Sequence, residues 1–387
     1  MTDQTDVLII GGGPVGGSLA LALKDSGLDV MVLEAQPETA PAEDPRALAL
    51  SHGSRQILGR LGVWQRLHHA TPIEHIHVSQ RGGFGVTRMD AAEAGVPALG
   101  YVADYTTLNR AVQEAVKTSG VTYLSGATVQ AVHTGPEQAE VTFQMDGITR
   151  QVSARLLAVA DGGRNLAAMP GFERRERDYH QTALIANVRT EIPHCNMAFE
   201  RFTPLGPMAL LPHNEGCALV WTLPPMAAEE TAALSDEEFL QQLHQHFGDR
   251  LGAFTAVERR AAFPLKLKQA ASVTLQRTVL IGNAAQTLHP VTGQGFNLGV
   301  RDAWELGAAI RAATLEELGS AAMLARYRDS RRSDTRSGIA FTDTLVRLFS
   351  NADPALELGR GLGLAALGML PPARHFLMRR MIYGARG

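Results

Sequence analysis

The stretch DVLIIGGGPVGGSLALALKDSGLDVMVLE, residues 6–34, decides the fold because it contains every part of a βαβ unit. Residues 7–10 form a short, fully apolar run of the kind found in a central parallel strand. A helix of small and apolar residues is predicted for residues 15–26, with Gly27 as its end, and LDVMVLE is predicted as the next strand. The N-terminus therefore predicts a parallel sheet with a helix on one face.

Glycines follow the first strand in the GxGxxG register of dinucleotide-binding loops. Gly11 allows the tight turn, Gly13 lets the backbone approach a pyrophosphate, and Gly16 lets the helix lie close to the sheet. Glu34 ends the second strand, where a carboxylate accepts hydrogen bonds from ribose hydroxyls and repels a 2′-phosphate. The unit therefore favours FAD or NAD over NADP. A Glu that simply ends an exposed strand is the alternative interpretation of Glu34.

The composition is that of an ordinary globular protein of 387 residues with 45% hydrophobic content, enough for two domains or for one large α/β domain with an inserted layer. A net charge of -3 does not favour a nucleic-acid partner. Cys195 and Cys217 stand alone without metal-ligand spacing, so we expect neither a metal site nor a disulfide.

The targeting signals favour a cytoplasmic protein. The N-terminus lacks a basic region followed by a secretory apolar segment, and no run of about 18 apolar residues suggests a membrane-spanning helix. From Arg326 to the end, however, eleven arginines stand against five acidic residues. This basic tail, together with the apolar run LGLAALGML at residues 362–370, suggests docking at the inner face of the membrane, and packing against the rest of the protein is the alternative.

The middle of the chain predicts a second, mostly antiparallel sheet. The runs ALIANV, MAFERF, MALLP and CALVWTL between residues 182 and 223 are predicted strands, and RGGFG at residues 81–85 is a predicted hairpin turn. Asp146 and Gly147 predict another hairpin turn. Helices are predicted for residues 56–67, for a segment that begins with a capping box at Ser235 and ends at Gly248, and for all of the chain beyond residue 306.

A second strand, glycine-rich loop and helix come late, in VLIGNAAQTLHPVTGQGFNLGVRDAWEL at residues 279–306. The early GxGxxG with Glu34, the sequence ADGG at residues 160–163 and this late motif, in that order, resemble the single-component FAD-dependent aromatic hydroxylases over essentially the whole chain. RALALS, AFERFTPLGPMALLP and GNAAQTLHP with GQGFNLG are most similar to the branch of that family that acts in ubiquinone biosynthesis.

The resemblance implies an α/β fold with an FAD-binding, doubly wound domain of the glutathione-reductase type, an inserted and mostly antiparallel substrate sheet, and a helical C-terminus. The expected FAD domain comprises residues 1–75, 100–180 and 265–325, the substrate domain residues 76–99 and 181–264, and the helical region residues 326–387.

The resemblance also implies the reaction. A 2-polyprenyl-6-methoxyphenol would be hydroxylated to the 1,4-benzoquinol with O2 and NAD(P)H through a flavin C4a-hydroperoxide. NAD(P)H would bind transiently near the flavin, without a Rossmann domain of its own. A long polyprenyl tail is costly to hold in water, at about 0.8 kcal/mol per buried CH₂, so the membrane surface or a lipid-binding partner is expected to present it. Other quinone-biosynthesis proteins are expected partners.

By the same resemblance, residues from all three motifs would bind FAD, and His289 with Pro290 would flank its reactive face. The implied FAD-binding residues are Gly11, Gly13, Pro14, Gly16, Glu34, Arg46, Val129, Asp161, Gly162, Asn283, Pro290, Gly293, Gln294, Gly295 and Phe296. The candidate substrate residues on the predicted sheet are Arg201, Phe202, His213, Trp221 and Phe263.

Two departures from the family pattern bear on this assignment. Most of the family has Asp at the position of Asn283, whereas the ubiquinone branch is similar to this chain in having Asn. An amide can both accept a hydrogen bond from a ribitol hydroxyl and donate one to it. In the Asp-Gly motif, Asn165 replaces the usual Ser and Ala168 the usual Arg, in a motif that serves flavin and nicotinamide handling.

Several alternatives follow. The chain could be a catalytically weak FAD-binding subunit that organises a quinone-biosynthesis complex, or a hydroxylase of another ring position in the same pathway. A halogenase is disfavoured because Trp64, Trp221 and Trp304 are scattered and form no WxWxIP signature. An isoprenoid reductase stays open, and a simple NAD dehydrogenase leaves the late motif unexplained.

Overall fold

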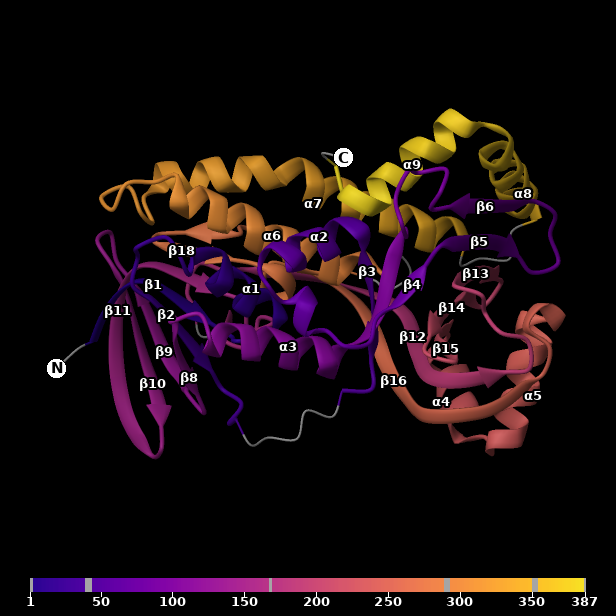
Figure 1. Ribbon diagram of the computed structural model, residues 1–387, viewed down its shortest axis with the longest axis horizontal. Helices are drawn as coiled ribbons and strands as arrows, with labels where there is room; N and C mark the ends of the chain where they lie inside the picture. The colour runs from indigo at the N-terminus through magenta and orange to yellow at the C-terminus, as the bar shows by residue number, and fades with distance from the viewer. Residues whose placement is uncertain (1–2, 39–43, 167–168, 289–292, 350–353, 386–387) are drawn as a thin grey trace.

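The computed structural model describes residues 3–38, 44–166, 169–288, 293–349 and 354–385. Two eight-stranded sheets lie side by side along the long axis, the first to the left and the second to the right in Figure 1, with long helices above them. The strands β12 and β16 extend from the second sheet toward the first.

The first sheet has a parallel centre. Its strand β1 lies between β11 and β2 and pairs with both in parallel, and β8 and β18 extend the parallel pairing on either side. Val7, Leu8 and Ile9 of β1 are completely buried, as expected of a continuous apolar run in a central strand. In order across the sheet, the strands are β17 (Thr274–Leu275), β18 (Thr278–Leu280), β11 (Ile148–Val159), β1 (Asp3–Ile10), β2 (Val30–Glu34) and β8 (Thr122–Ser125), with β10 (Ala139–Met145) and β9 (Thr128–Thr134) paired beyond β11.

Different layers cover the two faces of this sheet. Val7 and Ile9 pack with helices on one face, and Leu8 and Ile10 pack on the other against the antiparallel ribbon of β9 and β10, where Phe143 lies. Successive side chains of a strand point to opposite faces, so one apolar run supplies both cores. The helices are α1 (Pro14–Leu23), α3 (Tyr105–Lys117) and α6 (Gln294–Arg311).

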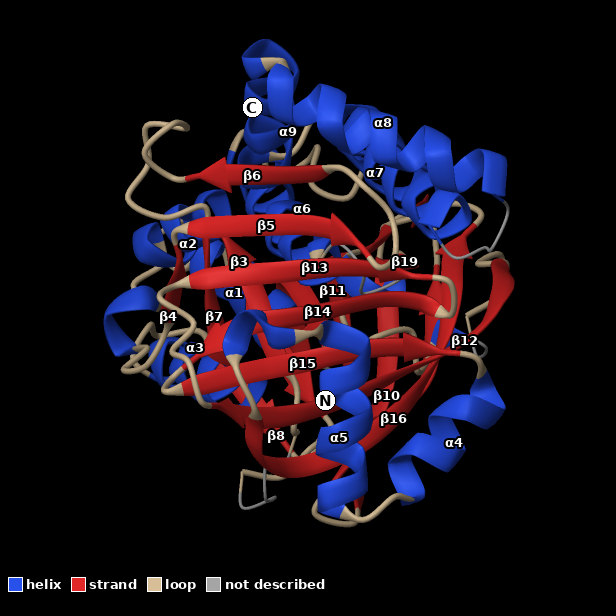
Figure 2. Ribbon diagram, turned by 90° about the vertical axis from the view of Figure 1, so that its right-hand side faces the viewer, coloured by secondary structure: helices blue, strands red, loops and turns tan. Residues whose placement is uncertain are grey.

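The second sheet is antiparallel except for the parallel pair β13 and β5. Helices α4 (Pro225–Ala233) and α5 (Asp236–Phe247) cover its outer face, which is turned to the viewer in Figure 2, and Trp221 and Phe239 fill the core between them. In order, the strands are β19 (Gln286–Thr287), β16 (Phe254–Ala270), β12 (Arg174–Thr190), β15 (Gly216–Leu223), β14 (Gly206–His213), β13 (Met197–Thr203), β5 (His75–Gln80) and β6 (Val86–Asp90).

A small sheet and the C-terminal helices connect the two halves. The small sheet consists of β3 (Ala47–Ser51), β7 (Gly100–Asp104) and β4 (Thr71–Ile73), and α2 (His52–Arg60) follows β3. Helix α7 (Ala321–Phe349) runs along the upper side, whereas α8 (Pro354–Met369) and α9 (Pro371–Tyr383) lie over β5 and β6 (Figure 1). Thus the C-terminus covers the edge of the second sheet.

A buried ion-pair network fixes α7 to α6. Arg331 contacts Asp302 at 2.8 Å and Asp334 at 2.9 Å, and Asp334 also pairs with Arg301 at 2.8 Å. All four side chains are largely buried, and the other Asp334 oxygen accepts a hydrogen bond from the amide of Ala385. The network therefore holds the end of the chain against the helices of the first half.

The predicted fold class is confirmed by this architecture and by the solved structures reported below. The Asp146–Gly147 hairpin turn and the Ser235 capping box are confirmed as well. The limits of two predicted helices are wrong. The helix predicted for residues 15–26 already ends at Leu23. The helix predicted for residues 56–67 begins at His52, because Ser51 caps it by accepting from the amide of Ser54, and it ends at Arg60. The domain boundaries stay a prediction.

Candidate active site

The first loop of the site lies between β1 and α1. Gly11 has φ of +99°, a left-handed conformation that favours glycine, and a Cβ on Gly16 would lie 1.9 Å from the carbonyl oxygen of Gly11. Around Gly13 the space is open, since a Cβ there would meet only the Tyr105 hydroxyl, at 3.8 Å. The backbone at Gly13 and the N-terminus of α1 are thus accessible to an anion such as a pyrophosphate.

Glu34 lies beside this loop at the end of β2. One carboxylate oxygen accepts from the amide of Gly12 at 2.6 Å, and the other accepts from the amide of Gln36 at 2.8 Å. A carboxylate has about four acceptor positions, so two remain for ribose hydroxyls. The backbone bonds fix the direction in which the carboxylate points.

Arg46 comes to the same region from the segment before β3. Its guanidinium lies 5.0 Å above the ring of Tyr105, and its Nε donates to Asp44 at 2.8 Å. The Asp44 hydrogen bond raises the pKa of Arg46, and burial raises the pKa of Tyr105. The charges of Arg46, Asp44, Glu34 and Arg164 all act on the Tyr105 hydroxyl, which lies next to Gly13.

The Asp-Gly motif forms a loop that touches the first one. A Cβ on Gly11 would lie 2.8 Å from the Cα of Asp161. The Asp161 carboxylate accepts from the amide of Gly163 at 2.8 Å and from both the amide and the side chain of Asn165, at 2.9 and 2.8 Å. The residue that departs from the family pattern thus closes the loop by donating to Asp161. Ala168 lies outside the described residues.

The late loop lies against the start of α1. Gly282 has φ of +58°, and a Cβ there would lie 3.1 Å from Val15. A carboxylate oxygen of Asp302 on α6 accepts from the amide of Gly282 at 3.2 Å and from the side chain of Gln286 at 3.0 Å. The side chain of Asn283 is exposed and forms no hydrogen bond with a described residue, so it is available to a ligand.

The N-terminus of α6 is the third part of the site. Gly293 caps it with φ of +59°, and no atom lies within 4 Å of a Cβ placed on Gly295. The buried side chain of Asn297 donates to the carbonyl oxygens of Ala49 and Gly293, at 2.9 and 2.8 Å, and accepts from the amide of Ser51. Asn297 therefore joins this helix end to β3.

The structure places the remaining candidates as follows. Gln294 donates to the carbonyl oxygen of Met381 on α9 at 3.3 Å, and Phe296 packs against the helical core of the first half. Val129 lies on β9 and packs against the other core, and its role in FAD binding stays a prediction. His289 and Pro290 lie outside the described residues.

Asn297 and Asp302 were missed by the sequence analysis. Both lie in the late motif, and each is a buried polar side chain in a predicted helix, which is the signal that could have identified them. Burial raises the pKa of Asp302, and the neighbouring Arg331 opposes that effect. These residues hold the loops and leave the ligand-facing backbone free.

The three loops fit FAD. They follow β1, β11 and β18, three neighbouring parallel strands, and ligands of open α/β sheets bind at such carboxyl ends. Gly11 to Gly16 would receive the pyrophosphate, Glu34 the ribose, Asn283 the ribitol, and the α6 N-terminus the pyrimidine edge of the ring, where its helix dipole favours negative charge. When bound, the flavin supplies the reaction with O2.

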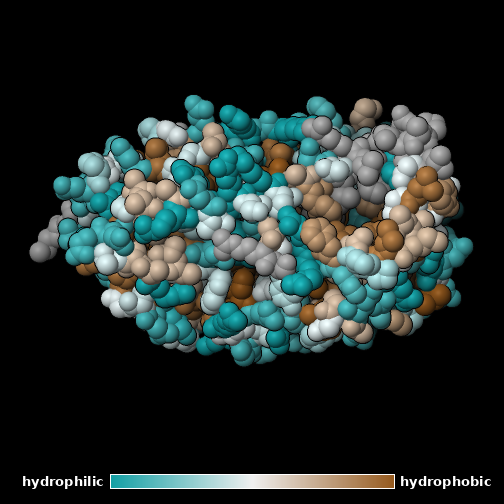
Figure 3. Space-filling view, turned by 90° about the horizontal axis from the view of Figure 1, so that it is seen from above, coloured by the Kyte–Doolittle hydropathy of each residue, from teal (hydrophilic) through white to brown (hydrophobic). Residues whose placement is uncertain are grey.

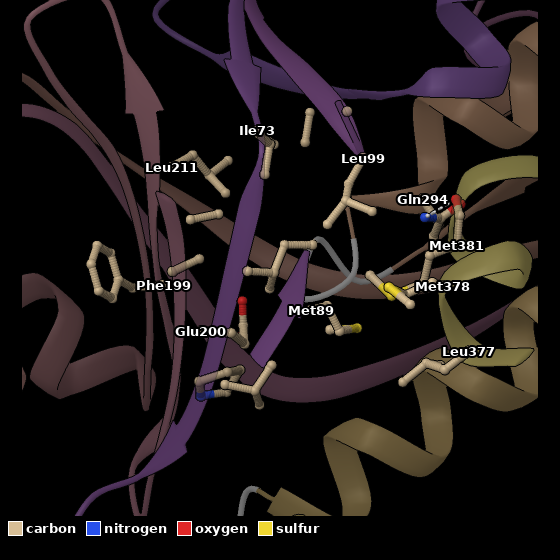
Figure 4. A pocket seen from close by; sticks show the side chains of 18 of the residues that line it. Ile73, Met89, Leu99, Phe199, Glu200, Leu211, Gln294, Leu377, Met378 and Met381 are labelled. Atoms are coloured by element: carbon tan, nitrogen blue, oxygen red, sulfur yellow. Dashed lines mark hydrogen bonds between the residues drawn. The ribbon is translucent and has the colours of Figure 1, made fainter. Parts of the chain in front are cut away.

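A cavity of about 390 Å³ adjoins the α6 N-terminus. Gly293, Gln294 and Asn297 line one side of it, and the inner face of the second sheet lines another. Leu377, Met378 and Met381 of α9 close it opposite the sheet, as Figure 4 shows. Most of its lining is apolar, so it suits a hydrophobic ligand next to the site that FAD would occupy.

Of the five substrate candidates, Phe202 lines this cavity, whereas Arg201, His213, Trp221 and Phe263 do not. Trp221 and Arg201 lie on the other face of the second sheet, where Trp221 packs on Phe239 and Arg201 donates to the carbonyl oxygen of His246. His213 lies at the end of β14 and pairs with Asp104 at 3.2 Å, and Phe263 lies on β16 with 37% of its surface exposed. Their assignment to the substrate stays a prediction, which the cavity does not support.

The neighbours of these candidates line the cavity instead. Glu200 and Phe202 on β13 and Thr222 on β15 face it, because strand side chains alternate between the two faces. Residue type alone selected the candidates, whereas the register decides which face is the inner one. Phe202, also named from the sequence, lies on that inner face.

Glu200 is an acidic side chain in apolar surroundings. Its carboxyl forms no hydrogen bond or ion pair with a described residue, and burial raises its pKa well above the usual range. Its direct neighbours across the strands are Val78 and Ala209. This carboxyl therefore faces the cavity without a protein partner from the described part of the chain.

The described residues contain no group of three or more His, Cys, Asp or Glu residues placed to hold a metal ion. No helix among them is both long and apolar enough to cross a bilayer. The expectation of no metal stays a prediction.

Relatives and solved structures agree with the fold, and a family model agrees with FAD as the cofactor. A family model of an FAD binding domain matches residues 4–342. Ubiquinone hydroxylase UbiL of Rhodospirillum rubrum is 36% identical over 383 residues, which cover 97% of this chain and 88% of the relative. The 3-demethoxyubiquinol 3-hydroxylase of Escherichia coli is 32% identical over 378 residues, which cover 95% of each chain. Both alignments cover nearly the whole chain.

Among solved structures, p-nitrophenol 4-monooxygenase of Pseudomonas putida aligns with a TM-score of 0.82 over 100% of both chains at 20% identity. PqsL of P. aeruginosa, in complex with 2-aminobenzoylacetate, aligns with a TM-score of 0.78 over 94% of this chain and 99% of that one at 22% identity. At such identities the likeness shows a common fold.

The family model and the named relatives, together with the fold, define a flavoprotein monooxygenase of the aromatic-hydroxylase class. The chain belongs to the family described as FAD binding domain, and it is an FAD-dependent aromatic-ring monooxygenase. The resemblance to the hydroxylases of ubiquinone biosynthesis, predicted from the motifs, is confirmed by the named relatives.

Proposed function

We propose that this protein hydroxylates the aromatic ring of a polyprenylated methoxyphenol in ubiquinone biosynthesis, with O2 and NAD(P)H as co-substrates. The observation that carries the proposal is the apolar cavity between the α6 N-terminus and the second sheet. It adjoins the place where the flavin ring would lie, and relatives of this chain are named as ubiquinone hydroxylases.

The residues of the site would bind FAD, orient the substrate ring and exclude water from it. The α1 N-terminus and Glu34 would hold the nucleotide end of FAD, and the late loop with Asn283 would hold the ring end. Apolar side chains such as Leu211 and Met378 line the cavity and keep water from the reacting ring carbon. Ring hydroxylation at this site needs no nucleophilic side chain, because the cofactor supplies the oxygen chemistry.

The size of the cavity limits what it can enclose. At about 390 Å³ it lies near the lower end of the 300–1,000 Å³ range of small-molecule sites. We therefore expect it to hold the phenol ring and the first part of a tail, with a longer tail leaving the cavity. Gly363 and Leu364 of α8 and Leu377 of α9 line the helical side of the cavity, and their apolar surface suits the first part of a tail.

We further propose that the outer surface of α8 and α9 lies on the membrane. Met369 is 80% exposed, Phe376 66% and Leu370 55%, and Phe84 on the neighbouring hairpin is 52% exposed. Figure 3, seen from above, shows apolar surface on the right-hand part of the molecule. Arg379 and Arg380 lie on α9 close to these side chains and suit anionic lipid headgroups.

The reaction is tested by product analysis. Purified holoprotein is supplied with NADPH or NADH, ¹⁸O2 and a panel of methoxyphenols that carry short prenyl tails. We expect a product with one labelled ring hydroxyl, with turnover that rises as the tail grows from one to two isoprene units. An unlabelled product with a reduced alkene would identify a reductase, and bound flavin that NAD(P)H never bleaches would favour a silent FAD-binding subunit.

The membrane surface is tested separately by flotation with vesicles of phosphatidylcholine containing phosphatidylglycerol. Met369→Asp is expected to weaken vesicle binding and to leave turnover of a short-tailed phenol unchanged. Met226→Asp is the matched control, since Met226 is 74% exposed on α4, on the outer face of the second sheet. Equal binding of both variants would contradict the docking proposal, and binding only to a lipid-carrying protein would replace the membrane with that partner.

A further inference from the structure

Glu200 has no role in the function derived so far, although it lies on the cavity wall. It is held by the middle of β13, in register with Ala209 of β14 and Val78 of β5. These pairs place apolar side chains on both sides of it, and Phe202 faces the cavity two residues further along the strand. Figure 4 shows the Glu200 carboxyl between the sheet and the side chain of Met89.

A carboxyl in such surroundings has a cost for the fold. Burying a polar group without a hydrogen-bond partner costs free energy, and burying it as a charge costs more. An apolar residue at this position would not have that cost, and the neighbouring positions of the inner face are occupied by apolar residues such as Val78 and Ala209. Glu200 is half-buried and forms no hydrogen bond with a described residue, so a partner for its carboxyl can lie in the open cavity in front of it.

The cavity also defines the chemistry of the partner. Glu200 and Arg360 are the charged side chains among the described residues that line it, and they form no ion pair with each other. The partner must therefore be a largely apolar molecule with a hydroxyl that can donate to, or share a proton with, one carboxyl. A prenylated phenol has this combination.

We propose that Glu200 binds the ring hydroxyl of the phenolic substrate and accepts its proton during hydroxylation. This inference rests on the proposed function, because it assigns a residue of the same cavity. In the step, the O–H bond of the phenol breaks, the proton passes to a carboxylate oxygen of Glu200, and the bonding pair stays on the phenol oxygen. That pair raises the electron density of the ring, which favours attack on an electrophilic oxygen.

The pH dependence follows from the same proton. Glu200 accepts a proton only as a carboxylate, so turnover should rise as the pH increases through the pKa of the carboxyl. Across the strands β5 and β14 present the apolar Val78 and Ala209 to Glu200, and Arg360 of α8 is the other charged side chain among the described residues that line the cavity. We therefore expect the rate to fall at acidic pH, and we assign this acid limb of the pH–rate profile to the protonation of Glu200.

Three variants test the proposal with a short-tailed methoxyphenol as substrate. E200Q keeps the hydrogen bond to the phenol but cannot take up a proton, so we expect kcat to fall about 10²-fold, with little change of KM and without the acid limb. E200L removes both functions and should also raise KM. E258Q is the control, because Glu258 is exposed on β16 of the same sheet, and its kinetics should equal those of the wild type.

A binding measurement without turnover separates the two proposals. 4-Nitrophenol absorbs visible light as the phenolate, and difference spectra of the oxidised holoprotein report its ionisation. We expect the bound phenolate to form at lower pH in the wild type and in E258Q than in E200Q, because the carboxyl and the phenol share one proton. A common pH profile in all three proteins would overturn the role of Glu200. Wild-type protein that ionises the bound phenol through Glu200 but hydroxylates no phenol would overturn the proposed function alone.

Discussion

At Gly295, a small side chain should stabilise the protein without FAD but weaken the binding of FAD. Gly295 is the second residue of α6, its φ is not left-handed, and a Cβ there meets no atom within 4 Å. Gly295→Ala should therefore stabilise the protein without FAD by about 0.4–1 kcal/mol, because alanine loses less backbone entropy on folding. The same methyl group would enter the space proposed for the pyrimidine edge of the flavin, so FAD should bind more weakly.

The expected shifts of Tm are small but opposite. At roughly 2.1 cal/mol/K per residue, unfolding 387 residues changes the entropy by about 0.8 kcal/mol/K, so the gain without FAD raises Tm by about 1 °C. A tenfold weaker affinity for FAD lowers the stabilisation by saturating FAD by about 1.4 kcal/mol, or about 2 °C. The variant should thus melt above the wild type without FAD and below it with FAD.

Differential scanning fluorimetry of both proteins, stripped of FAD and then titrated with it, measures these shifts. Gly338→Ala is the matched control, because Gly338 lies in α7 and a Cβ there also meets no atom within 4 Å. It should gain stability and keep the full FAD shift. If Gly295→Ala keeps the full FAD shift as well, the flavin ring does not lie at the α6 N-terminus, and the assignment of the late loop is refuted.

The remaining predictions concern Glu34, Asn297 and Glu200. Glu34→Ala should raise the FAD dissociation constant by about tenfold or more in a fluorescence titration, because ribose hydroxyls lose an acceptor and the amide of Gly12 loses its partner; unchanged affinity would remove Glu34 from the site. Asn297→Leu should lower the stability by about 2–4 kcal/mol in urea unfolding, because three buried hydrogen bonds are lost; a loss below about 0.5 kcal/mol would refute its structural role. The pKa of the Glu200 carboxyl is raised in the folded protein, so the folded state keeps this proton to a higher pH than the unfolded state does. The stability of the wild type should therefore fall relative to that of E200Q as the pH rises above about 4.3, the ordinary pKa of a glutamate. A constant difference in Tm between the two proteins from pH 4 to pH 8 would show that the carboxyl is not in an apolar environment.

The sequence predicted the FAD-binding half in most of its parts. The run of residues 7–10 has no polar side chain to place, so a strand buried on both faces follows from composition alone. The glycines of the first motif also act locally, because the left-handed φ of Gly11 and the close approach of Gly16 to Gly11 are demands of one short loop. The helix limits were less accurate, since the capping hydrogen bond of Ser51 outweighed the apolar pattern that begins at Gln56.

The substrate cavity was beyond what the sequence could predict. Arg201 and Trp221 were chosen by residue type, but the register of β13 and β15 turns them to the outer face and turns Glu200 and Thr222 to the cavity. A shift of one residue in the register of a strand moves its side chains from one face of the sheet to the other. The sequence of the strand alone does not indicate which face a distant helix will cover.

The sequence by itself determined the nucleotide-binding unit, the order of the three motifs and the family, because these depend on short-range backbone geometry and on residues in contiguous stretches. Tertiary structure alone decided that the three loops meet at the carboxyl ends of neighbouring strands, and that α9 closes an apolar cavity beside them. It also decided that the carboxyl of Glu200 faces this cavity. These features join segments up to several hundred residues apart, and their contacts arise only when the sheets and the C-terminal helices pack together.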